Sequence, residues 1–116
     1  MAKDKFALGI DYGTESGRAV VVRVRDGKLM ASQVVPYPDG VIDEKLPTGP
    51  QLEPDWALQN PQDYLTVVEK AVPKALKAAG IKGAEVIGIG TDFTASSPMP
   101  TKAEGTPLSA LPQFRK

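Results

Sequence analysis

The stretch from Gly9 to Arg18 constrains this chain more than any other part of the sequence. It lies between two apolar runs, at 6–10 and 19–24, that are rich in β-branched residues and predict two short strands. The turn joining them combines glycines with hydroxyl, carboxylate and guanidinium groups. A plain hairpin requires only the glycines, and that interpretation stays open. The second interpretation is an anion cradle at 9–18, because successive backbone N–H groups in a tight turn converge on negative charge.

Two charged side chains in this stretch suit such a cradle. Asp11 stands at the predicted end of the first strand, where a carboxylate could hold a hydrated Mg²⁺ beside the bound anion. Arg18 could add a bidentate contact. The pattern therefore predicts a phosphate site with Asp11 as its metal ligand.

Composition narrows the class of protein. A chain of 116 residues forms at most one domain, and 41% hydrophobic residues are enough for a core. The 14 basic and 14 acidic residues cancel, which predicts neither a nucleic acid nor a membrane surface as partner. Cysteine and histidine are absent, so disulfides, thiolate metal sites and histidine base catalysis are excluded within the chain. The lack of a long apolar stretch predicts a cytoplasmic protein without a signal peptide.

The remaining elements follow from local signals. Asp26 and Gly27 predict a hairpin turn into a third strand at 28–35, which gives three antiparallel strands. A long loop is expected at 36–59, where five prolines occur, and loops of this length are usually functional or mobile. A short hairpin is expected to end near Leu108.

A helix and a fourth strand complete the prediction. The helix spans 60–79, with Asn60 as its cap, Gly80 as its end and Pro73 as an expected kink. The strand spans 85–91, and its apolar run predicts that it is fully buried. Because a helix precedes it, the strand should run parallel to its neighbour.

The β-β-β-α-β order and the Gly-Ile-Asp-x-Gly-Thr-x-Ser-x-Arg pattern resemble the FGGY carbohydrate kinases. These belong to the actin, Hsp70 and sugar kinase superfamily, whose domains have an RNase H-like α/β fold. The run 56–64 is similar to a Trp-x-Glu-Gln-Asp-Pro-x-x-Trp segment of the family, although Leu58 replaces an acidic residue and Asn60 an aspartate. Trp56 there is expected mainly as an anchor that pins the long loop, with direct substrate contact as the alternative. The run Asp92 to Ala95 looks like that of the L-ribulokinase group.

The resemblance implies roles for individual residues. The phosphate-facing turn would consist of Gly13, Thr14, Glu15, Ser16 and Arg18, and Asp11 would hold Mg²⁺. The sugar would be bound by Asp92, Phe93, Thr94 and Ala95. For Asp92, a turn-forming role at a strand end is an equal alternative.

The resemblance also implies an activity and its participants. The parent protein would transfer the γ-phosphate of ATP to L-ribulose in L-arabinose catabolism, with Mg²⁺ as cofactor, and would form a homo-oligomer, expected to be a dimer. The chain would then be an incomplete N-terminal domain at 1–116, inactive alone, with the general base beyond residue 116. A D-ribulokinase, another FGGY pentulose kinase, or a non-catalytic phosphate-binding, sugar-binding or protein-interaction module are the alternatives.

Overall fold

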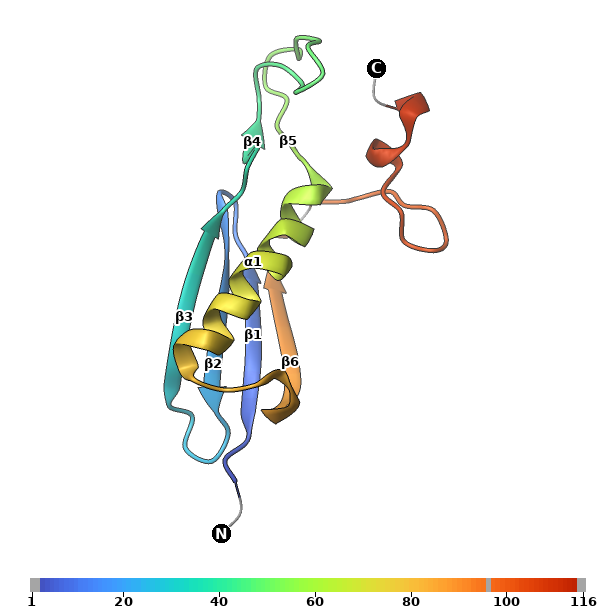
Figure 1. The fold of residues 1–116 in the computed structure, drawn as a ribbon. Coiled ribbons are helices and arrows are strands. Elements are labelled where there is room, and N and C mark those ends of the chain that lie inside the picture. Colours follow the sequence, from blue (N-terminus) through green and yellow to red (C-terminus); the bar gives the residue numbers. More distant parts are fainter. Residues whose placement is uncertain (1–2, 96, 115–116) are drawn as a thin grey trace.

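Four strands form one mixed sheet in the order β3-β2-β1-β6. The computed structural model describes residues 3–95 and 97–114. Strands β1 (Phe6–Tyr12), β2 (Ser16–Arg23) and β3 (Leu29–Pro36) are antiparallel, and β6 (Val86–Phe93) lies parallel to β1 (Figure 1). The predicted α/β class and the β-β-β-α-β order of the main sheet are therefore confirmed.

The helix α1 (Pro61–Ala79) has local signals at both ends. The side chain of Asn60 accepts a hydrogen bond from the backbone N–H of Gln62 at 3.0 Å, which satisfies one of the free donors of the first turn. Gly80 ends the helix in the left-handed conformation, with φ of 70°. The helix continues through Pro73 as one element, and Pro73 itself is exposed.

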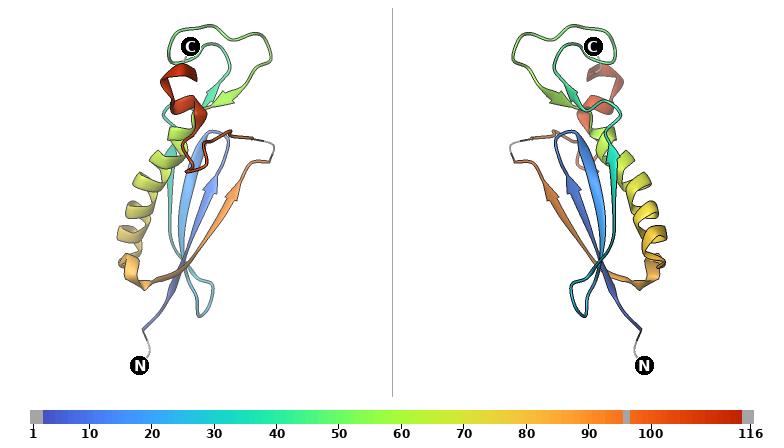
Figure 2. Two further views of the ribbon diagram at one scale, coloured as in Figure 1. Left: turned by 90° about the vertical axis from the view of Figure 1, so that its right-hand side faces the viewer. Right: turned by 90° about the vertical axis from the view of Figure 1, so that its left-hand side faces the viewer.

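The core lies between α1 and the sheet. Buried side chains from alternate positions of β1 and β2 face the buried side of α1, where Val67, Ala71 and Ala75 lie. The helix packs on β2 and β3, and it approaches β2 most closely at Gly17. A Cβ atom added to Gly17 would lie 2.4 Å from Val67 Cγ1, so only glycine permits this approach. Figure 2 shows α1 on one face of the sheet, with the opposite face uncovered in the described part of the chain.

The strand β6 corrects the prediction of a fully buried fourth strand. Ile87 is 59% exposed and Ile89 is 67% exposed, because β6 is an edge strand and α1 lies over β2 and β3 instead. The strand also continues to Phe93, so Asp92 and Phe93 belong to the strand rather than to the loop after it. Hydrophobicity alone predicted burial, whereas burial depends on a covering layer that the described residues do not supply.

The segment predicted as a long loop is partly a narrow ribbon. It contains β4 (Val41–Ile42) and β5 (Leu58–Gln59), which pair with each other, and an isolated bridge joins Lys45 to Gln51. Short 3₁₀ helices follow at Gly83–Glu85, Leu108–Ala110 and Pro112–Phe114. The hairpin expected near Leu108 is a turn closed by a single bridge between Thr101 and Pro107.

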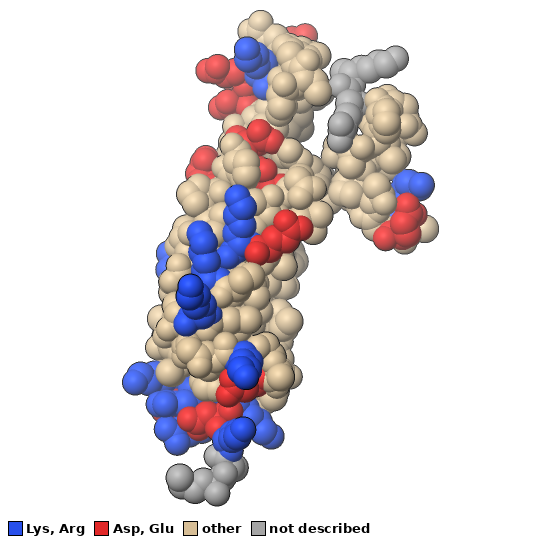
Figure 3. Space-filling view, in the orientation of Figure 1, with Lys and Arg blue, Asp and Glu red and all other residues tan. Residues whose placement is uncertain are grey.

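The ribbon and the C-terminal segment extend beyond one end of the sheet, which gives a molecule of 59 × 27 × 23 Å. On the face shown in Figure 3, basic side chains follow α1 and the lower end of the sheet, while acidic side chains gather toward the ribbon. Within residues 3–95 and 97–114, no helix is both long and apolar enough to span a bilayer.

Candidate functional site

The turn between β1 and β2 is held from one side by hydrogen bonds to its carbonyl groups. The hydroxyl of Tyr37 donates to the carbonyl of Gly13 at 2.8 Å, and the backbone N–H of Tyr37 donates to the carbonyl of Glu15 at 3.0 Å. Between them, Nε2 of Gln59 donates to the carbonyl of Thr14 at 3.0 Å. Three successive carbonyl groups of the turn therefore face the segment after β3 and the strand β5.

This anchoring determines where the N–H groups of the turn point. In a trans peptide, the C=O of one residue and the N–H of the next point in opposite directions, and no described peptide is cis. The N–H groups of Thr14 and Glu15 therefore point away from Tyr37 and Gln59, and neither donates to another described residue. Gly13 differs, because its N–H donates to the carbonyl of Ser16 at 2.9 Å and closes the hairpin. The geometry is compatible with a hairpin that also presents two free donors to an anion.

Asp11, Asp92 and Arg18 lie on the face of the sheet opposite α1. Asp11 pairs in register with Arg18 on β2 and with Asp92 on β6, and all three are exposed. The guanidinium of Arg18 donates to the hydroxyl of Ser32 on β3 at 3.1 Å, which draws it away from the tip of the turn. In the described part of the chain, no three potential metal ligands lie together. A Mg²⁺ ion at Asp11 would therefore need water and phosphate oxygens to complete its coordination.

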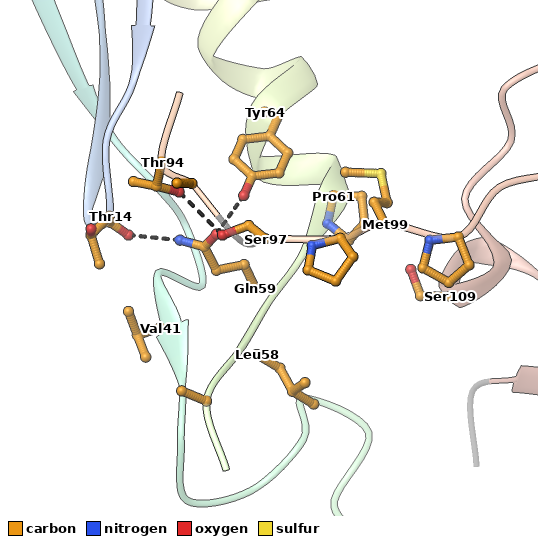
Figure 4. A pocket seen from close by; sticks show the side chains of 14 residues that line it. Thr14, Val41, Leu58, Gln59, Pro61, Tyr64, Thr94, Ser97, Met99 and Ser109 are labelled. Atoms are coloured by element: carbon orange, nitrogen blue, oxygen red, sulfur yellow. Dashed lines mark hydrogen bonds between the residues drawn. The ribbon is translucent and has the colours of Figure 1, made fainter. Parts of the chain in front are cut away.

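A pocket of about 680 Å³ opens beside this turn (Figure 4). Its walls come from the turn, the ribbon, the start of α1 and the segment after β6: Thr14, Val41, Ala57, Leu58, Gln59, Pro61, Tyr64, Thr94, Ala95, Ser97, Pro98, Met99, Pro100 and Ser109. The pocket thus brings Thr14 of the predicted phosphate turn together with Thr94 and Ala95 of the predicted sugar site. Asp92 and Phe93 do not line it, and Phe93 is 70% exposed on the edge strand.

Two pocket residues, Gln59 and Tyr64, were missed by sequence reasoning. The hydroxyl of Tyr64 donates to Oε1 of Gln59, and the ring of Tyr64 makes edge-to-face contacts with Tyr12 and Tyr37 at centroid distances of 5.4 and 5.6 Å. Burial raises the pKa of Tyr64, and burial is also the main cause that raises the pKa of Tyr37 to about 12. Both phenols therefore remain protonated donors at neutral pH. The Gln in the family-like segment at 56–64 was the available signal.

The segment that carries Tyr37 is held against the start of α1 by Asp63. This carboxylate is 3% exposed and accepts hydrogen bonds from the N–H groups of Asp39 and Gly40, each at 3.1 Å. Burial is the main cause that raises the pKa of Asp63, the nearby charge of Asp39 raises it further, and the two hydrogen bonds only partly offset this rise. Nδ2 of Asn60 also donates to the carboxylate of Asp39 at 2.6 Å. The helix start thereby positions Tyr37, which anchors the turn between β1 and β2.

Trp56 corrects the expectation of an anchor that pins the loop. Its side chain is 55% exposed and does not line the pocket, whereas the following residues Ala57 and Leu58 do. The ribbon is held instead by the pairing of β4 with β5 and by the hydrogen bond from Gln59 to Thr14.

Comparison with known proteins shows what this chain is similar to in sequence. No family model matches the chain. Ribulokinases from Geobacillus thermodenitrificans and Anoxybacillus flavithermus are each 54% identical over 112 residues, and one from Halalkalibacterium halodurans is 47% identical over 112 residues. Each match covers 96% of this chain and 20% of the relative, so the chain spans about a fifth of the length of these proteins.

A solved structure agrees at the level of the fold. Gluconate kinase from Lactobacillus acidophilus superimposes with a TM-score of 0.70 at 21% identity, covering 91% of this chain and 19% of that one. Together with the ribulokinase relatives, which carry the sequence evidence, this fold confirms the resemblance to carbohydrate kinases noted from the sequence. Over nearly all of its length, this chain is a relative of the ribulokinases.

Proposed function

We propose that this chain is the start of the first domain of an ATP-dependent ribulokinase, whose sugar substrate is L-ribulose and whose product enters L-arabinose breakdown. One observation carries the proposal. Thr14 of the anchored turn lines the same pocket as Thr94 and Ala95. Phosphoryl transfer requires the phosphate donor and the sugar to meet in one cavity, since most of its catalysis is positioning. The identity of 54% to named ribulokinases supports the same activity.

On the phosphate side, the N–H groups of Thr14 and Glu15 bind phosphate oxygens, and Ser16 supplies a hydroxyl from the next position in the chain. Asp11 holds a hydrated Mg²⁺ ion from the open face of the sheet, and Arg18 can leave Ser32 to add positive charge. Bound Mg²⁺ and ATP supply the phosphoryl group and neutralise its charge. Gly13 contributes the tight turn rather than a donor, because its N–H is already paired.

On the sugar side, Thr94 offers a hydroxyl, and Ala95 leaves room for substrate carbons in the pocket. Asp92 stands in register with Asp11 on the open face, outside the pocket lining. Among the proposed sugar contacts, Thr94 and Ala95 therefore have the stronger structural support.

The test uses the complete protein that carries this chain. Wild type should phosphorylate L-ribulose with ATP and Mg²⁺ in preference to D-ribulose and D-xylulose. Asp11→Ala should lower turnover by on the order of 100-fold or more, because the phosphate charge loses its bound cation. Sugar affinity, measured by calorimetry, should change little.

Asp43→Ala is the matched control, since Asp43 is an exposed carboxylate on the ribbon. It should leave turnover unchanged. A preference for D-ribulose would assign a different pentulose kinase. Absence of any sugar phosphorylation would favour the non-catalytic module, and near-normal turnover of Asp11→Ala would remove Asp11 from the metal role.

A further inference from the structure

The side chain of Gln59 joins three parts of the site. It comes from β5, donates through Nε2 to the carbonyl of Thr14 at 3.0 Å, and accepts through Oε1 from the hydroxyl of Tyr64 on α1. Both ends of the amide are therefore occupied by the protein (Figure 4). A side chain used in this way is suited to holding its neighbours in place, rather than to binding substrate.

The orientation of this amide follows from the chemistry of its partners. A backbone carbonyl can only accept a hydrogen bond, so the end of Gln59 that faces Thr14 must be the NH₂ group. The remaining oxygen then faces Tyr64, whose phenol has a raised pKa and stays protonated. The carbonyl of Thr14 thus fixes the orientation of the amide, and Tyr64 donates to the oxygen that remains.

The bond from Gln59 to Thr14 also fixes the next peptide group. Because the carbonyl of Thr14 and the N–H of Glu15 belong to one trans peptide, holding the first toward the ribbon turns the second away from it. Tyr37 does the same for the peptide between Gly13 and Thr14. The two free donors of the turn owe their direction to these two side chains.

We propose that Gln59 is a positioning residue that orients the phosphate-binding turn from the wall of the sugar pocket. The proposal deepens the proposed function and rests on it for the identity of the ligand. Gln59 lines the pocket together with Thr94, and its partner Thr14 lies in the turn. A change at the pocket wall is thereby transmitted to the donors that face the nucleotide phosphates.

Three variants of the complete protein test this. Gln59→Glu keeps the size of the side chain and an oxygen toward Tyr64, but it replaces the donor facing Thr14 with an acceptor. Tyr64→Phe keeps the Gln59 donor and removes only its second tether. Gln51→Glu is the matched control, since Gln51 is exposed on the same ribbon and is joined to Lys45 through the backbone.

Two measurements are made on each variant. Steady-state kinetics give separate KM values for ATP and for the sugar. Hydrogen exchange of the peptide that covers 9–18, with and without MgADP, reports the turn directly and does not depend on activity.

Gln59→Glu should raise the KM for ATP about tenfold, the effect of one lost hydrogen bond, with a change of less than about threefold for the sugar. Exchange in the turn should become faster, and MgADP should protect it less. Tyr64→Phe should shift both readouts in the same direction by a smaller factor, and Gln51→Glu should resemble wild type.

The outcomes separate the two proposals. If wild type phosphorylates no sugar but Gln59→Glu still accelerates exchange at 9–18, the proposed function fails and the positioning role stands. Unchanged exchange in Gln59→Glu overturns the positioning role whatever the activity. An equal rise in both KM values together with a lower melting temperature also overturns it, because that is the signature of a purely structural residue.

Discussion

At the scale of single residues, the contact of Gly17 with Val67 sets how closely the helix approaches the sheet. The sequence indicated Gly17 only as part of a turn, because its contact partner Val67 lies 50 positions away and no local pattern predicts the contact. Gly17→Ala should destabilise the protein by about 1–3 kcal/mol, since the added Cβ would meet a side chain that is fully buried. Val67→Ala should partly relieve this clash, so the double variant should lose less stability than the sum of the two single variants.

Thermal unfolding followed by circular dichroism measures these differences. Gly88→Ala is the control, because Gly88 is also in a strand but nothing lies within 4 Å of an added Cβ. It should be close to neutral. Strictly additive losses for the Gly17 and Val67 variants would show that the two residues are not in contact.

The distance in sequence between contacting residues also explains which candidate site residues the sequence singles out. Asp11 and Thr14 stand out through residue types that carry chemistry beside a strand end, and the run 92–95 stands out through the family resemblance; their roles stay predictions. Tyr37 and Gln59 do not, because their partners lie 24 and 45 positions away and are backbone carbonyls, which leave no mark on the sequence.

At the scale of elements, local signals succeeded where the cause was local. The ends of α1 follow from Asn60 and Gly80, each of which acts on the helix beside it. The burial of β6 and the pairing of β4 with β5 could not be predicted in this way, because they depend on which element lies alongside. Local signals therefore predicted the order of the elements correctly, but they predicted the burial of β6 wrongly.

The junction between β3 and α1 gives a prediction at this scale. Asp63→Ala leaves the N–H groups of Asp39 and Gly40 without their acceptor and should cost about 2–3 kcal/mol. Asp63→Asn retains one acceptor oxygen and should cost less. Thermal unfolding of both variants beside wild type measures the two losses.

Asp63 should also make stability depend on pH. Because burial raises its pKa above the unfolded value of 3.8, the folded state holds the proton more tightly, and stability falls as the pH rises above 3.8. The side chain in Asp63→Asn cannot ionise, so the stability of this variant lacks the decrease that Asp63 causes as the pH rises. The melting temperature of wild type minus that of Asp63→Asn should therefore shrink as the pH rises from about 3.5 to 6. A difference that grows with pH would mean that the two hydrogen bonds outweigh burial and the charge of Asp39 together.

At the scale of the whole molecule, the chain exposes more surface than a compact domain of its size. Its accessible area is 8111 Å², against about 6,100 Å² expected for a folded monomer of 12.3 kDa. Its radius of gyration is 17.1 Å, against about 13 Å for a compact domain of this length. The helix α1 covers one face of part of the sheet, and Ile87, Ile89 and Phe93 of the edge strand β6 remain exposed.

An open edge with apolar side chains favours association between copies. We therefore predict that the 116-residue chain, expressed alone, is marginally stable, self-associates, and does not phosphorylate L-ribulose with ATP. Light scattering should give a mass that rises with concentration, and Ile89→Lys should lower it because a charge on an edge strand opposes pairing. Leu65→Lys is the matched control, since Leu65 is 53% exposed on α1. It should leave the association unchanged. A monomer at all concentrations with a sharp transition at high temperature would show that the uncovered sheet is stable by itself, and would favour a stand-alone module over part of a larger kinase.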